Sequence, residues 1–140
     1  MTINRLRIVI ATAVAASGLS IAAAQQPGSD PNPNFTGVVT PMDAKDISGG
    51  RRKFEAGART AWHSHDRGQL IYAEQGRMRT GRRNQPIKEY EQGGSEYTPP
   101  NVEHWHGATP NEPLVQVNIQ FGGTTKWLKP ITDAEYNARK

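Results

Sequence analysis

Turn-forming residues interrupt this chain every few positions, and their spacing leaves room only for short β-strands. The interruptions are Gly57, Gly68, Gly76, Asn84–Pro86, Gly93–Gly94, Pro99–Pro100 and Pro110–Asn111. Between them lie candidate strands over residues 51–56, 61–65, 69–75, 78–83, 87–91, 95–98, 103–108 and 114–121. Many short strands at such intervals are typical of a β-sandwich or β-barrel. The chain is therefore predicted to form an all-β domain.

A single short helix is expected, at the C-terminal end. Residues 132–139 are the one stretch that keeps a helical period. Thr132 or Asp133 can begin this helix, because both side chains accept hydrogen bonds from the first free backbone N–H groups.

The first 24 residues have the features of a secretory signal peptide. Asn4–Arg7 is basic, Ile8–Leu19 is apolar, and Ala22–Ala24 fits a cleavage site formed by small residues. An uncleaved anchor helix is the alternative. It is less favoured because Ser17 and Gly18 interrupt the apolar run, which is short for a membrane span of about 20 residues. We therefore expect a periplasmic or secreted protein with no stable membrane anchor after cleavage.

Cleavage would leave one small domain with little net charge. Residues 25–34 are rich in Gln, Pro and Asn and are expected to form a disordered leader, and residues 35–140 form the domain. The chain has no Cys, which excludes disulfides. Its net charge is +4, but loss of Arg5 and Arg7 leaves 15 basic against 13 acidic residues, or +2. Arg77, Arg79, Arg82 and Arg83 are interpreted as a solvated hairpin face, so no nucleic-acid partner is expected.

All four histidines fall in two pairs with one residue between the members of each pair. The pairs are His63 with His65 and His104 with His106. Side chains two apart on a strand leave the same face, so each pair directs two imidazoles to one side. We expect the two pairs to lie on facing strands, with His104 on the sheet opposite the first pair. Imidazoles gathered in this way favour a divalent transition metal.

These pairs lie within two longer motifs. The first runs Gly57, five residues, His63, one residue, His65, three residues, Gln69, six residues and Gly76. The second runs Gly93, five residues, Pro99, one residue, Asn101, two residues and His104, with Ala108 four positions on. They resemble the two motifs of the cupin superfamily, G-x5-H-x-H-x3-E-x6-G and G-x5-P-x-G-x2-H-x3-N. Gln69, Asn101 and Ala108 depart from that pattern, and Asn101 is tolerable because Asn accepts a left-handed turn.

The resemblance implies a cupin fold, which is a double-stranded β-helix or jelly-roll barrel, here with a short C-terminal helix. It also implies one metal ion held by His63, His65, Gln69 and His104. Three imidazoles and an amide oxygen are neutral ligands, so a bound divalent ion keeps its charge and favours an anionic partner. Coordination positions that the protein leaves open are then available to water or a small-molecule substrate.

A closer resemblance covers roughly residues 54–136. The residues that carry it are Phe54, Gly57 to His65, Gly68–Gln69, His104 to Ala108, Ile119–Gln120, Trp127, Ile131 to Asp133 and Tyr136. They are similar to small bacterial cupins that act as R-selective hydroxynitrile lyases, within the carboxymuconolactone decarboxylase-like group. The resemblance implies manganese as the first choice of metal, with iron, nickel, cobalt or zinc as alternatives. It also places Thr60 and His106 near the metal and adds Gln120 to the candidate catalytic residues.

One candidate catalytic position departs from these lyases. They carry a further histidine where this chain has Gln116, and an amide cannot take up a proton at neutral pH. His106 is then the titratable group near the metal. Three functions stay open: a metal-dependent lyase for a small carbonyl or hydroxyl compound, an oxygenase, and a non-enzymatic ligand- or metal-binding barrel. A homodimer or a higher homo-oligomer is possible, and the apolar strand 114–119 is compatible with dimerisation.

Overall fold

The computed structural model describes residues 34–138. The predicted signal peptide, residues 1–24, and residues 25–33 of the predicted leader lie outside the described residues. The chain divides into two units, Met1–Pro41 and Met42–Lys140. The described residues of the first unit, 34–41, contain no helix or strand. Within residues 34–138, no helix is both long and apolar enough to cross a membrane.

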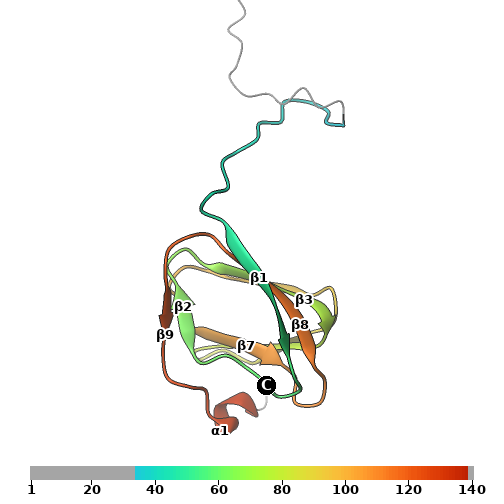
Figure 1. Ribbon diagram of the computed structural model, residues 1–140. Helices are drawn as coiled ribbons and strands as arrows, with labels where there is room; N and C mark the ends of the chain where they lie inside the picture. The colour runs from blue at the N-terminus through green and yellow to red at the C-terminus, as the bar shows by residue number, and fades with distance from the viewer. Residues whose placement is uncertain (1–33, 139–140) are drawn as a thin grey trace, which may run out of the picture. The chain divides into compact units, whose positions relative to one another are not determined.

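The described part of the second unit consists of β-strands and one short helix (Figure 1). The strands are β1 (Ser48–Phe54), β2 (His63–His65), β3 (Gln69–Gly76), β4 (Met78–Arg82), β5 (Lys88–Tyr90), β6 (Ser95–Thr98), β7 (His104–Ala108), β8 (Leu114–Gln120) and β9 (Thr125–Trp127), and the helix is α1 (Asp133–Tyr136). The predicted all-β class with a short C-terminal helix is confirmed. Strand β9 was not predicted from the sequence.

The strands form two antiparallel sheets that enclose the interior of a barrel (Figure 1). One sheet has the order β1-β8-β3-β6, and the other has the order β5-β4-β7-β2-β9. Neighbours such as β3 and β8 are distant in sequence, because the chain passes repeatedly from one sheet to the other. This is the jelly-roll arrangement expected from the short strands.

The predicted placement of His104 on the opposite sheet is wrong. Strands β2 and β7 are neighbours in the five-stranded sheet, and His63 is the direct cross-strand partner of His104. Residue alternation determines which face a side chain leaves, but it does not determine which strands pair. Four strands separate β2 from β7 along the chain, so their pairing is a property of the whole barrel.

Two apolar clusters stabilise the barrel. One contains Trp62, Ile87, Trp105, Ile131 and Tyr136, and the other contains Ile71, Ala73, Met78, Ala108 and Leu114. Burial of such side chains contributes about 25 cal/mol per Å² of apolar surface removed from water. Helix α1 contributes Tyr136 to the first cluster, and the Tyr136 hydroxyl donates to the carbonyl of Ala108, a residue of the second cluster, at 2.7 Å.

Helix α1 begins as the sequence predicted. The Thr132 side chain accepts a hydrogen bond from the backbone N–H of Glu135, and the Glu135 carboxylate accepts one from the backbone N–H of Thr132. This reciprocal capping box satisfies two backbone donors that a helix start otherwise leaves free. It fixes a helix of only four residues at the point where Tyr136 enters the core.

Only two members of the basic cluster are exposed as its spacing suggested, Arg77 and Arg83, at 40% and 36%. The Arg79 and Arg82 side chains are only 12% and 18% exposed. The pairs are Arg77 with Glu89 and Glu91, Arg79 with Glu89, Arg82 with Glu96, and Arg83 with Glu103 and Glu135. The cluster is therefore neutralised by carboxylates of the same domain.

Candidate metal centre

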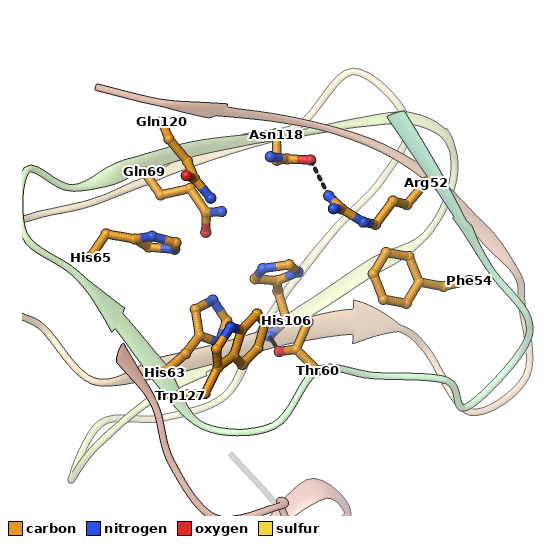
Figure 2. A pocket seen from close by; sticks show the side chains of 10 residues that line it. All are labelled: Arg52, Phe54, Thr60, His63, His65, Gln69, His106, Asn118, Gln120 and Trp127. Atoms are coloured by element: carbon orange, nitrogen blue, oxygen red, sulfur yellow. Dashed lines mark hydrogen bonds between the residues drawn. The ribbon is translucent and has the colours of Figure 1, made fainter. Parts of the chain in front are cut away.

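A cavity of about 130 Å³ lies in the barrel interior and is lined by residues of both sheets (Figure 2). The lining residues are Arg52, Phe54, Thr60, His63, His65, Gln69, His106, Asn118, Gln120 and Trp127. They come from β1, β2, β3, β7, β8, β9 and the segment before β2. Residues far apart in sequence thus meet around one small space.

Three buried histidines gather at one end of this cavity. His63, His65 and His104 are each no more than 3% exposed. The ring centroids of His63 and His104 are 4.2 Å apart, and the ring of His65 lies 5.1 Å from His63 and 5.4 Å from His104. The spacing of two residues within β2 and the pairing of β2 with β7 together produce this grouping.

The Nδ1 atom of each of these three rings has a hydrogen-bond partner. The Nδ1 of His63 lies 2.9 Å from the carbonyl of Ala61, and that of His104 lies 3.0 Å from the carbonyl of Val102. Because a carbonyl only accepts, both Nδ1 atoms carry the hydrogen and both Nε2 atoms keep a lone pair. The Nδ1 of His65 lies 3.0 Å from the Thr125 hydroxyl. Contacts of this kind orient metal-ligating histidines in proteins.

Gln69 reaches the same point from the opposite sheet. Its Oε1 lies 3.1 Å from the Nε2 of His104. Because the Nδ1 of His104 donates to the Val102 carbonyl, its Nε2 is an acceptor, and so is the Oε1 of Gln69. A cation between these two acceptor atoms would bind both of them. The His65 Nε2 is likewise buried without a hydrogen-bond partner among the described residues. The four predicted ligand residues are therefore brought together in a form that fits a metal ion, and metal binding by this set stays a prediction.

His106 extends the cluster along the cavity. One ring nitrogen from each of His63, His104 and His106 lies within 4.8 Å of the others, so these three histidines form a group able to hold a metal. The backbone N–H of His106 donates to the hydroxyl of Thr60 at 3.2 Å. His106 was predicted to lie near the metal but outside the ligand set. Its position in this group makes it an alternative to His65 as the third imidazole.

Burial keeps these imidazoles neutral. It lowers the pKa of His63 to about 4, against the opposing hydrogen bond to the Ala61 carbonyl. It lowers the pKa of His104 to about 3, and the nearby His63 adds to this effect. The pKa of His106 is also well below its usual value because the ring is fully buried next to His63 and His104. Neutral imidazole is the form that binds a metal, so no proton competes at neutral pH.

The remaining predicted catalytic residues divide into two groups. Thr60 and Gln120 line the cavity, as expected for residues that could touch a substrate. Gln116 is buried in contact with His106 and is not among the lining residues. Its carbonyl oxygen and the Nδ1 of His106 are both buried without a hydrogen-bond partner in the described part of the chain.

Sequence reasoning missed several residues of the cavity wall. Arg52, Phe54, Asn118 and Trp127 line it but were not singled out as site residues. The signal for the first two was present, because Arg52 and Phe54 are two apart in a predicted strand and must share a face. Trp127 was out of reach, since it lies on the strand that was not predicted.

Comparisons with known proteins identify the family of this chain. Residues 50–119 match the family described as Cupin domain. The chain is 33% identical over 121 residues to an (R)-mandelonitrile lyase of Granulicella tundricola. The aligned region covers 80% of this chain and 92% of the relative.

Solved structures show the same fold. A cupin-like protein of Thermotoga maritima has 38% sequence identity and a TM-score of 0.63, with 65% of this chain and 71% of the other covered. A DMSP lyase of Ruegeria pomeroyi has a TM-score of 0.54 at 14% identity, over 63% of this chain and 46% of the other, and shares the fold alone.

Proposed function

The chain belongs to the cupin family, and we propose that it is a metal-dependent lyase for a small substrate with a hydroxyl or carbonyl group. The observation that carries this proposal is the convergence of His63, His65, His104 and Gln69 at the end of a cavity. The similarity to a mandelonitrile lyase over most of the chain supports the reaction type. We propose manganese as the metal, on the resemblance to manganese-dependent lyases of this group.

The metal site and the cavity supply the parts of such a reaction. A divalent ion held by His63, His65, Gln69 and His104 would supply Lewis acidity and would lower the pKa of a substrate hydroxyl. His106 lines the cavity in neutral form and can accept the proton of that hydroxyl. Thr60 and Gln120 offer a hydroxyl and an amide to orient the substrate. The rings of Phe54 and His106 pack edge to face with their centroids 6.2 Å apart, and this contact helps to hold His106 in place.

Gln116 stands where the related lyases carry a second base, and this limits the expected rate. Gln116 contacts His106 but cannot accept a proton at neutral pH. Burial also makes His106 a weak base, because its protonated form is unfavourable in the barrel interior. We therefore expect weak cleavage of mandelonitrile, and the natural substrate of the proposed lyase to be a different small molecule.

The first experiment measures metal content. Purified wild-type protein should hold one divalent ion per chain by mass spectrometry, and the double variant His63→Ala/His65→Ala should hold none. Gln69→Ala should bind metal more weakly than wild type. Gln92→Ala, which changes an exposed turn residue, is the matched control and should bind like wild type. Full metal content in the double variant would disprove the proposed site.

The second experiment measures cleavage of mandelonitrile with manganese added. His106→Ala should lower the rate. Gln116→His should raise it by roughly tenfold, because a general base contributes about 10²- to 10⁴-fold when well placed. If wild type and both variants are all indistinguishable from buffer while metal is bound, the lyase proposal fails, and an oxygenase or binding barrel is favoured instead.

A further inference from the structure

Arg52 is exposed to solvent in part and lines the cavity on the side away from His63 and His65 (Figure 2). On β1, Arg52 and Phe54 line the cavity (Figure 2). Arg51 instead forms an ion pair with Glu74 of β3. The Nη1 of Arg52 donates to the Oδ1 of Asn118 at 2.8 Å. Asn118 is only 6% exposed and belongs to β8, the strand paired with β1. The guanidinium is therefore held at the cavity by a buried neutral partner.

No carboxylate neutralises this arginine within residues 34–138. Eight arginines lie in that range, and seven of them pair with an Asp or Glu side chain. They are Arg51, Arg59, Arg67, Arg77, Arg79, Arg82 and Arg83. Arg52 is the exception among them. The described arginine without an acidic partner is thus the one that lines the cavity.

The cavity itself contains no compensating negative charge. Its ten lining residues include no Asp and no Glu. The proposed metal ligands are neutral as well, so a bound divalent ion would add its full charge to that of Arg52. A guanidinium still has several N–H donors in one plane after a single hydrogen bond to Asn118. These donors match the two oxygens of a carboxylate.

From this arrangement we propose that the substrate carries a carboxylate, which Arg52 binds at the side of the cavity away from His63 and His65. Asn118 is the positioning residue that orients the guanidinium. The inference rests on the proposed function for the metal at the other end of the cavity, and it narrows the substrate to a small hydroxy or oxo acid. The aromatic rings of Phe54 and Trp127 line the same cavity and can contact an apolar part of such an acid.

Two matched compounds separate charge from shape. (R)-mandelate and (R)-mandelamide have nearly the same size and both carry the hydroxyl group, but only mandelate is an anion. Their affinities for wild type, Arg52→Gln, Arg52→Lys and Arg51→Gln are measured by titration calorimetry, with and without added manganese. Arg51 is the matched control because it neighbours Arg52 on β1 but pairs with Glu74. Lactate and lactamide serve as a smaller pair with the same charge difference.

Wild type should bind the acid more tightly than the amide. Arg52→Gln should weaken binding of the acid by roughly 10- to 100-fold, the usual effect of losing a charged hydrogen bond, and should leave the amide unaffected. Arg52→Lys should retain part of the preference, and Arg51→Gln should bind like wild type. Equal binding of the acid by wild type and Arg52→Gln would overturn the inference, as would failure of wild type to bind either acid.

The same samples distinguish this inference from the proposed function. Metal content and melting temperature are measured on each variant before titration. If the wild type binds no metal but its preference for the acid depends on Arg52, the metal proposal fails and the carboxylate site stands. If metal is bound and Arg52→Gln changes nothing, the carboxylate site fails and the metal proposal stands.

Discussion

At the scale of single residues, the outer contacts of the histidines determine what their inner nitrogens can do. The carbonyls of Ala61 and Val102 fix the tautomers of His63 and His104, so both rings turn a lone pair inward. The Ala61 carbonyl lies just before β2 and the Val102 carbonyl just before β7. The short connections before the two strands therefore orient the imidazoles, while the strands themselves set their spacing.

Stability of the metal-free protein should fall as the pH is lowered from 7 to 4. The pKa of His63 is about 4 in the folded state and 6.5 ordinarily, so below pH 6.5 the unfolded chain binds more protons. The stabilisation is complete above pH 6.5 and is lost progressively toward pH 4. His63 alone should account for up to roughly 3 kcal/mol of this loss. Urea unfolding of metal-free protein across this range measures the effect.

His63→Gln is the comparison for the pH experiment. The variant lacks the titrating ring, so its free energy of unfolding should depend less steeply on pH between 4 and 6.5. His65, His104 and His106 still contribute, because burial lowers the pKa of each of them as well. An identical slope in wild type and His63→Gln would contradict the assignment of this pH dependence to the buried ring.

At the scale of elements, sequence periodicity predicted the strands and the faces of their side chains. Residue alternation sufficed to bring His63 and His65 to one side and His106 into the cavity. It could not show that β2 and β7 are neighbours, because pairing depends on how the whole chain closes into a barrel. It also missed β9, a strand of three residues that pairs with β2.

Strand β9 contributes to the candidate metal centre through Thr125. Pairing with β2 sets Thr125 opposite His65, and its hydroxyl lies 3.0 Å from the His65 Nδ1. Thr125→Val keeps the side-chain shape but removes the hydroxyl. Loss of such an orienting contact typically lowers metal affinity by about 10- to 100-fold. Competition with a metal-binding dye should show this decrease.

Thr132→Val is the control for that variant. This substitution also removes a hydrogen bond of a threonine hydroxyl, but Thr132 caps the start of α1 and is not part of the candidate metal centre. The change should cost about 1 kcal/mol of stability and leave metal affinity unaltered. Equal metal affinities in Thr125→Val and wild type would show that β9 does not orient His65.

At the scale of the whole molecule, we propose that the protein is exported. The basic start, the apolar run and the small residues up to Ala24 support this proposal. Protein isolated from its natural host should begin at Gln25, as determined by N-terminal sequencing. Replacing Ala22 and Ala24 with bulky residues should block cleavage. A chain that begins at Met1 in the cytoplasm would contradict export.

The proposed metal also has a consequence for the barrel as a whole, because its ligands come from both sheets. His63, His65 and His104 belong to the five-stranded sheet, whereas Gln69 belongs to the four-stranded sheet. A bound ion would therefore join the sheets across the interior. The unfolded chain does not hold these residues together, so metal binding should stabilise the folded state by mass action.

The melting temperature measures this stabilisation directly. At a free metal concentration 100 times the dissociation constant, binding contributes about 2.7 kcal/mol. For a domain of roughly 100 residues this corresponds to an increase of about 10–20 °C in Tm. A chelator should reverse the increase. Gln69→Ala should reduce it, because the four-stranded sheet then loses its ligand, and Gln92→Ala should preserve it. Equal melting temperatures for chelated and manganese-loaded protein would mean that no ion connects the two sheets.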